Sequence, residues 1–211
     1  MASPKDIDAE KLRQRLTGTA LRDDPLDVDL PADSERWPAG MLENMTGSLK
    51  PAGVLIPVID HAAELSILLT QRAADLKHHA GQVSFPGGRM EAHDADITET
   101  ALRETYEEIG IAAHEVSVIG YLQPMPTITG YAVTPVVGLI AAGVELTIDR
   151  TEVDYTFEVP LRFLLERSNR RLVERELHGK KVPMVEFHYA GERIWGATAY
   201  MLMQFLKILE K

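Results

Sequence analysis

Residues 85–111 read FPGGRMEAHDADITETALRETYEEIGI and join a pair of glycines to a segment rich in acidic residues. Asp94 and Asp96 precede a segment with helical periodicity, and Gly110 follows it. Aspartate is a preferred residue at the start of a helix, and glycine is preferred just after the last turn. The pattern therefore predicts a helix over residues 96–109.

Three carboxylates lie close together on this predicted helix. Glu104 and Glu108 are four residues apart, and Glu107 is three residues from Glu104, so all three share one side of the helix. Like charges at these spacings cost a few tenths of a kcal/mol per pair. We expect the glutamates to lie off the core, because the apolar stripe is formed by Ile97, Ala101, Leu102, Thr105 and Ile109. Arg103 is four residues before Glu107 and is predicted to neutralise and orient it.

This acidic cluster has two interpretations. A run of charges is most often a solvated helix face, and that interpretation applies to Glu104, Glu107 and Glu108 as well. Three hard oxygen ligands on a rigid element also suit Mg²⁺ or Mn²⁺. The glycine loop favours the metal site, because Gly87 and Gly88 permit a backbone carbonyl to approach the helix closely.

Composition excludes several classes of protein. The chain has 211 residues, 45% of them hydrophobic, which is enough for one domain with a sizeable core. It contains no cysteine, which excludes disulfides, cysteine nucleophiles and thiolate metal sites. The formal net charge of −10 argues against nucleic acid as a partner. No segment resembles a membrane span or a secretory signal, so we expect no membrane partner and a cytoplasmic location.

The chain divides into two parts by composition. Residues 1–47 are predicted to be an N-terminal extension, partly helical or irregular, that lies over the surface or is partly disordered. Residues 48–211 are predicted to be the main domain. Its expected strands and helices do not follow a regular βαβ rhythm, which favours an α/β fold with a mixed sheet. The expected strands cover residues 52–59, 64–72, 82–86, 115–123, 131–141, 155–160, 171–179 and 185–196, and the expected helices cover residues 96–109, 161–167 and 197–209.

The glycine loop and acidic helix resemble the Nudix box, which reads G, five residues, E, seven residues, then R-E-U-x-E-E-x-G-U with U aliphatic. The match starts at Gly88, and residues 103–111 read RETYEEIGI, with Thr105 at one aliphatic position. Asp94 stands at the first glutamate position, but eight residues separate it from Arg103. The pattern therefore leaves a structural role for Asp94 open.

An upstream segment narrows the resemblance. Residues 68–88, LLTQRAADLKHHAGQVSFPGG, are similar to the signature of the coenzyme A pyrophosphatase branch, L-L-T-x-R-[SA], a basic position, then G and F-P-G-G. The extra residue before the helix is also typical of that branch. Lys77 stands where the branch usually has arginine, which keeps the charge and loses the bidentate fork. The resemblance covers about residues 50–209.

The resemblance implies a fold, an activity and a metal site. The fold is a Nudix-type α/β/α sandwich, and a homodimer is expected. The activity is metal-dependent hydrolysis of the pyrophosphate bond of coenzyme A, or a derivative, to 3′,5′-ADP and a 4′-phosphopantetheine product. By position, Glu104, Glu107, Glu108 and the carbonyl of Gly88 are the expected ligands of Mg²⁺ or Mn²⁺. Arg103 is expected to hold Glu107 in place.

The same resemblance suggests groups for catalysis and substrate binding. The general base is expected to be Glu104 or, as family relatives often use an acid from a distant loop, Glu152. Phosphate contacts are expected from Arg72, Lys77 and His79, each of which has surface salt bridging as the alternative interpretation. Tyr131 is expected to border the pocket, although a tyrosine in such a position is as often part of the packing.

Two other functions stay open at this stage. One is an ADP-ribose or dinucleotide pyrophosphatase of the same fold, which Lys77 and Tyr155 keep possible. The other is a catalytically silent binding module. The complete set of Glu104, Glu107 and Glu108 argues against a silent module, because binding alone has no need for three metal-ligating carboxylates.

Overall fold

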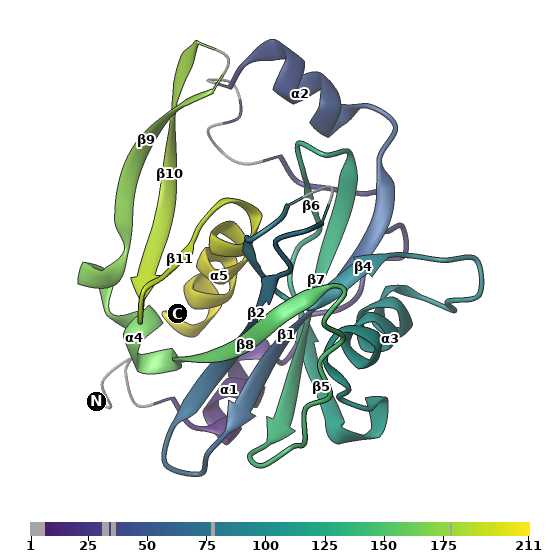
Figure 1. The fold of residues 1–211 in the computed structure, drawn as a ribbon, viewed down its shortest axis with the longest axis vertical. Helices are drawn as coiled ribbons and strands as arrows, with labels where there is room; N and C mark the ends of the chain where they lie inside the picture. Colours follow the sequence, from purple (N-terminus) through teal and green to yellow (C-terminus); the bar gives the residue numbers. More distant parts are fainter. Residues whose placement is uncertain (1–6, 31–33, 35–36, 77–78, 178) are drawn as a thin grey trace.

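The structure is a computed structural model that describes residues 7–30, 34, 37–76, 79–177 and 179–211 (Figure 1). Its main sheet has eight strands in the described part of the chain. Five of them lie in the order β3-β2-β1-β7-β5, and β4, β6 and β8 pair with β1, β7 and β2. The strands are β1 (Lys50–Asp60), β2 (Leu65–Arg72), β3 (Val83–Ser84), β4 (Gly87–Arg89), β5 (Val116–Tyr121), β6 (Met125–Pro126), β7 (Tyr131–Ala141) and β8 (Val153–Pro160).

Both strand directions occur in this sheet. β1 and β7 pair in parallel from Lys50↔Tyr131 to Asp60↔Ala141, and the other pairs are antiparallel. These two central strands are almost continuously apolar, which is typical of strands buried on both faces. The prediction of a mixed-sheet α/β fold is therefore confirmed.

Helices cover both faces of the main sheet (Figure 1). One core cluster packs α1 (Ala9–Leu16) and α5 (Gly196–Leu209) against one face, with Ile56 and Val58 of β1 pointing into it. The other cluster packs α3 (Ile97–Ile109) against the opposite face, where Leu55 and Ile59 of β1 point. Alternation along β1 thus builds two cores and gives the predicted α/β/α sandwich.

A second sheet of three strands stands beside α5 (Figure 1). It has the order β11-β10-β9, and the chain folds back between β10 and β11 at Ala190 and Gly191, which have φ angles of 51° and 93°. This turn divides the strand expected over residues 185–196 between β10 and β11. The remaining bounds are β9 (Arg171–Leu177), β10 (Lys180–Tyr189), β11 (Glu192–Ile194), α2 (Ala39–Thr46) and α4 (Leu161–Leu165).

The N-terminal region does more than lie over the surface. Leu12 and Leu16 of α1 have exposed fractions of 0% and 1% and belong to the larger core cluster. Beyond α1, the hydroxyl oxygen of Thr19 accepts a hydrogen bond of 3.0 Å from the amide of Tyr121, on strand β5 at the end of the strand order. The helix was predicted, whereas its contribution to the core was not.

Two further elements differ from the sequence-based expectation. α2 lies in the N-terminal extension, and β6 lies between the strands expected over residues 115–123 and 131–141; neither was among the expected elements. β6 has only two residues and pairs with the first residues of β7, so it is a tertiary feature with no periodicity of its own. Among the described residues, no helix combines the length and apolar character needed to span a bilayer.

Candidate active site

The acidic helix begins and ends at the predicted residues. Asp96 caps α3 by accepting a hydrogen bond of 2.9 Å from the Glu99 amide. Gly110 ends the helix with a φ of 79°, and a Cβ there would lie 2.7 Å from the Cβ of Thr147. Glycine is therefore required at this position both by the left-handed backbone and by the close approach of the following loop.

The inward face of α3 differs from the predicted stripe in two places. Thr100 is buried, and Leu102 is only half-buried. Glu108 is buried with an exposed fraction of 2%, so the expectation that all three glutamates lie off the core is wrong. Glu108 lies next to the end of β2, where Arg72 supplies the counter-charge.

Glu108 has few of the hydrogen bonds that a buried carboxylate normally has. Its Oε1 lies 3.4 Å from Nη1 of Arg72, and its Oε2 has no hydrogen-bond partner among the described residues. Burial raises the pKa of Glu108 to about 8; Arg72 opposes the shift, whereas the charges of Glu152 and Glu104 add to it. A buried, unpartnered carboxylate oxygen of this kind is stabilised by a cation.

Glu104 occupies the space above the glycine loop. Gly88 pairs with Gly53 of β1, and a Cβ at Gly88 would lie 2.4 Å from the Cδ of Glu104. The carboxylate therefore rests directly on the backbone, which confirms why the loop needs glycine at this position. Burial raises the pKa of Glu104, and the hydrogen bond from Arg103 opposes that shift.

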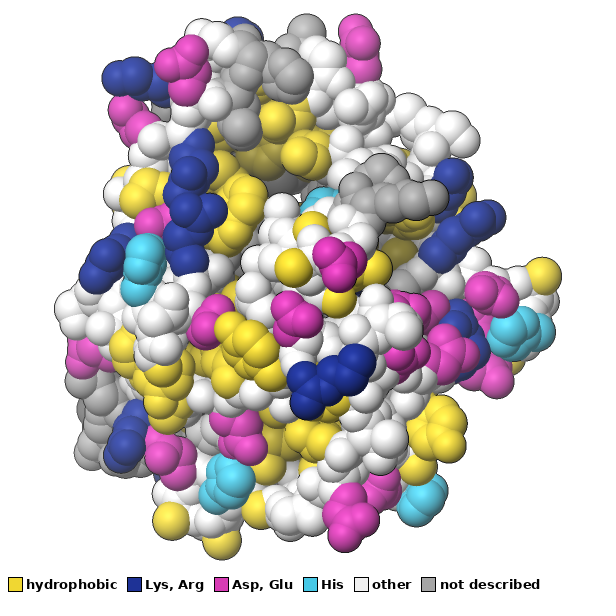
Figure 2. Space-filling model, in the orientation of Figure 1, with side chains coloured by type: hydrophobic (Ala, Val, Ile, Leu, Met, Phe, Trp, Pro, Cys, Tyr) yellow, Lys and Arg dark blue, Asp and Glu magenta, His cyan; other side chains and the backbone are white. Residues whose placement is uncertain are grey.

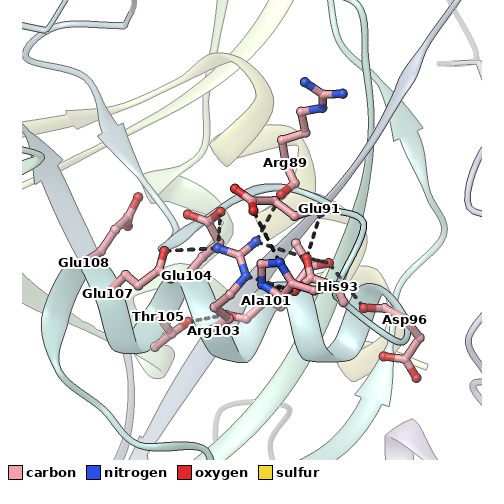
Figure 3. Close-up of polar contacts among 12 residues, drawn as sticks. Arg89, Glu91, His93, Asp96, Ala101, Arg103, Glu104, Thr105, Glu107 and Glu108 are labelled. Atoms are coloured by element: carbon pink, nitrogen blue, oxygen red, sulfur yellow. Dashed lines mark hydrogen bonds and ion pairs between the residues drawn. The ribbon is translucent and has the colours of Figure 1, made fainter.

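Arg103 organises the acidic residues around it (Figure 3). Its Nη1 lies 2.9 Å from Oε1 of Glu104 and 3.0 Å from Oε2 of Glu107. Its Nε and Nη2 donate to Asp94 over 2.9 and 3.0 Å, and Nη2 also donates to the carbonyl of Arg89 over 3.2 Å. These contacts use all five N–H donors of a guanidinium group. The predicted contact between Arg103 and Glu107 is confirmed. A lysine at position 103 has too few N–H donors to make all of these contacts.

The structure gives Asp94 the structural role that the sequence left open. The carboxylate is buried, receives two hydrogen bonds from Arg103 and accepts others from the hydroxyl of Thr100 and the amide of Glu91, at 3.0 and 2.8 Å. The extra residue of the loop is absorbed before the helix, because Asp96 forms the N-cap two residues later. Asp94 thus holds Arg103 from the side opposite to the glutamates.

Removal of this carboxylate is expected to destabilise the fold. Hydrogen bonds from Arg103 hold the pKa of Asp94 well below its ordinary value, so the pair stabilises the folded state above the unfolded pKa, about 4. This contribution is lost as the pH falls through the lower folded pKa. Asp94→Asn should therefore lower the free energy of unfolding at pH 7 by about 3 kcal/mol. At pH 3, which lies below the unfolded pKa and above the folded one, the loss should be smaller by about 1 kcal/mol.

Urea unfolding of wild type and variant at both pH values measures this difference. Asp23→Asn, at an exposed position in the N-terminal region, is the matched control and should change stability little. An Asp94→Asn protein with wild-type stability at pH 7 would show that the pair of Asp94 and Arg103 does not stabilise the fold.

The two remaining acidic residues stand at the open side of the site. Glu107 has a side chain that is 55% exposed, and Arg103 holds it from one side. Glu152 is exposed in the turn before β8, and its charge acts on the pKa of both Glu104 and Glu108. The structure therefore brings Glu152 within electrostatic range of the buried carboxylates, as a base from a separate loop requires.

The expected phosphate contacts have varied surroundings. Arg72 is turned toward Glu108, and its Nε is buried without a hydrogen-bond partner among the described residues. His79 has a φ of 56°, and its Nδ1 lies 2.9 Å from Oε1 of Gln82. Lys77 lies outside the described residues. The backbone of Tyr131 bonds to Thr127, and its side chain packs against the larger core cluster.

The carboxylates suit a divalent cation, although their oxygens are not gathered in advance. No three acidic or histidine side chains of the described residues converge on one point, because Arg103 holds Glu104 and Glu107 while Arg72 holds Glu108. Two observations support the fit: the unpartnered Oε2 of Glu108 and the seat that Gly88 leaves for Glu104. Hard carboxylate donors next to a backbone loop are the ligand set of Mg²⁺ or Mn²⁺.

Comparison with known proteins decides the family. The NUDIX domain family matches residues 49–184, more than half of the chain, and this range contains the glycine loop and all of α3. The chain belongs to the Nudix hydrolase family. As a Nudix hydrolase it has the expected fold class, and enzymes of this family generally use divalent metal ions such as Mg²⁺ or Mn²⁺.

Curated relatives of this Nudix hydrolase have the same family name. An uncharacterized Nudix hydrolase NudL from Pectobacterium atrosepticum is 43% identical over 74% of this chain and 80% of its own length. The NudL of Photorhabdus laumondii is 38% identical over 77% of this chain and 86% of its own length. A Nudix hydrolase from M. smegmatis, RenU, is similar in structure with a TM-score of 0.46, 21% identity and coverage of 56% of this chain and 73% of its own.

Proposed function

We propose that this Nudix hydrolase cleaves the pyrophosphate bond of coenzyme A or a derivative, with water, to 3′,5′-ADP and a 4′-phosphopantetheine product. The observation that carries the proposal is a pair of carboxylates, the partly buried Glu104 seated on Gly88 and the buried Glu108 with an unpartnered oxygen, beside the signature in residues 68–88. Family membership supports hydrolysis of nucleoside diphosphate derivatives, and the upstream signature supports coenzyme A within that class.

The residues that would hold Mg²⁺ or Mn²⁺ are Glu104, Glu107, Glu108 and the carbonyl of Gly88. When bound, the ion neutralises charge on the pyrophosphate and makes water easier to deprotonate. Arg103 keeps Glu104 and Glu107 oriented, and its contacts to Asp94 fix the guanidinium itself.

A base must accept the proton of the attacking water. Glu104 and Glu152 are the two candidates, and each has a different advantage. Glu104 is at the expected ligand position and is partly buried, whereas Glu152 is exposed and comes from a separate loop that approaches both buried carboxylates. Phosphoryl transfer depends mainly on positioning and on charge neutralisation, so either placement is compatible with it.

Substrate phosphates need cationic contacts as well. In this proposal Arg72, Lys77 and His79 serve the phosphates, and Tyr131 borders the pocket. Arg72 is anchored by Glu108 at one nitrogen only, which leaves other N–H donors of its planar group for a phosphate. The expected homodimer also belongs to the proposal and is tested by the mass of the protein in solution.

Rates of hydrolysis for three substrates test the proposed specificity. With Mg²⁺ present, we expect kcat/KM for coenzyme A to exceed the values for ADP-ribose and NADH by at least about 100-fold, since a site that binds a substrate's polar groups strongly rejects analogues that lack them. Faster cleavage of ADP-ribose or NADH would assign the chain to the alternative, a dinucleotide-type pyrophosphatase. Absence of any hydrolysis with tight nucleotide binding would indicate a silent binding module.

A further inference from the structure

Two arginines flank a tryptophan at the edge of the small sheet. The Cζ of Arg193 lies 4.8 Å from the ring centre of Trp195, and the Cζ of Arg175 lies 5.5 Å from it. A guanidinium within about 6 Å of an indole ring is attracted to it, so both side chains have restricted freedom. His188 is the cross-strand partner of Arg193 and shares its face of the sheet.

The carboxylates near this face are already engaged. Glu186 is buried, and its two oxygens contact Arg175 over 3.1 Å and His188 over 2.8 Å. Glu192, on the opposite face of β11, accepts a hydrogen bond of 2.6 Å from the hydroxyl of Tyr155. Arg193 is exposed and has no carboxylate partner in the described part of the chain. Its positive charge is therefore fixed in place and uncompensated.

Two links join the part of the chain that carries this cationic group to the main sheet. The hydroxyl of Thr198, three residues after Trp195, donates to the carbonyl of Val83 over 3.0 Å, and Val83 leads directly into the loop that ends at Gly88. The bond from Tyr155 to Glu192 also ties β8, which pairs with β2, to β11. Figure 2 shows Lys and Arg side chains gathered over β9 and β10 and acidic side chains over the region of α3 on the same face of the molecule.

We propose that Arg193, held against Trp195, binds a phosphate group of the substrate that is remote from the scissile pyrophosphate. The ligand class is a nucleotide that carries an additional phosphomonoester. An arginine with a preset plane binds a phosphate through paired N–H donors. This inference rests on the proposed function, in which the additional group is the 3′-phosphate of coenzyme A. Arg72, the other arginine expected to bind phosphate, has only part of its guanidinium group available, because one of its nitrogens contacts Glu108.

Kinetics with two substrates test the subsite. Wild type, Arg193→Gln and Arg193→Lys are compared on coenzyme A and on coenzyme A without its 3′-phosphate. We expect Arg193→Gln to raise KM for coenzyme A about tenfold with kcat unchanged, because a hydrogen-bonded charge pair is lost. KM for the substrate without the 3′-phosphate should not change, and Arg193→Lys should restore part of the difference. Arg15→Gln, at an exposed position on α1, is the control that removes the same charge elsewhere.

Equal losses on both substrates would show that Arg193 only supports the fold, and no loss on either would exclude the contact; both results overturn the inference. Calorimetry without metal gives an independent readout: wild type should bind 3′,5′-ADP about tenfold more tightly than 5′-AMP, and Arg193→Gln should bind them alike. If wild type fails to cleave coenzyme A, the proposed function is wrong, while this titration still decides whether the phosphate subsite exists. Equal binding of the two nucleotides by wild type would contradict it.

Discussion

Glu104→Gln is expected to lower kcat for pyrophosphate hydrolysis by roughly 10³-fold, a loss in the range measured when one preorganised electrostatic group is removed from an active site. The substitution keeps the size of the side chain and removes its charge. Glu104 sits directly on Gly88 and receives a hydrogen bond of 2.9 Å from Arg103, so its carboxylate is held in one position beside the glycine loop. Steady-state rates with Mg²⁺ and with Mn²⁺ measure the effect.

Glu145→Gln is the matched control for this substitution. Glu145 lies in an exposed loop, and the same change of charge there should leave kcat within about twofold of wild type. Circular dichroism and urea unfolding check that Glu104→Gln remains folded. A Glu104→Gln enzyme with the wild-type rate would remove this residue from both of its proposed roles, as a metal ligand and as a candidate base.

Gly88→Ala is expected to lower kcat at least about 100-fold while the stability of the fold changes little. A Cβ at Gly88 would lie 2.5 Å from each carboxylate oxygen of Glu104, much closer than non-bonded atoms approach. The far end of Glu104 can move away without a shift of the backbone, so the carboxylate is displaced and the fold is retained. The displaced group no longer lies where it is needed, and misplacement by about 1 Å is enough to cost two orders of magnitude.

Alanine substitutions at two other glycines serve as comparisons for Gly88→Ala. Gly40 in α2 has open space beside its Cα, since no atom would lie within 4 Å of a Cβ added there, so Gly40→Ala should leave both rate and stability near wild type. A Cβ at Gly53 would lie 2.7 Å from the carbonyl oxygen of Ile97, so Gly53→Ala should lower stability instead. Parallel assays of rate and urea unfolding separate the three variants. Full activity of Gly88→Ala would contradict the close seat of Glu104.

Local patterns in the sequence were sufficient for the elements that depend on local forces. The helix of residues 97–109 was predicted to within one residue, because Asp96 and Gly110 act through bonds to their own neighbours. β7 has the predicted bounds, since a long apolar run at the centre of a sheet needs no partner to be recognised. The contact of Arg103 with Glu107 also followed from spacing alone.

The features that sequence reasoning missed are tertiary. Glu108 was expected on an open helix face, but it is buried beneath Arg72, which lies 36 residues earlier in the chain. Asp94 had no assigned role, because its contact with Arg103 depends on the conformation of the loop between them. Leu12 and Leu16 are four residues apart on α1, and nothing local indicated that they would enter the main core.

The central claim is that carboxylates from one helix bind divalent metal ions beside the glycine loop. Titration calorimetry with Mn²⁺, on wild type and on Glu108→Gln, tests it most directly because it does not depend on the identity of the substrate. We expect saturable uptake by wild type and a loss of affinity greater than about 100-fold in the variant, since removal of groups that only support a ligand already costs 10–100-fold. Equal uptake by the two proteins, or no uptake by wild type, would show that Glu108 and its neighbours do not form a metal site.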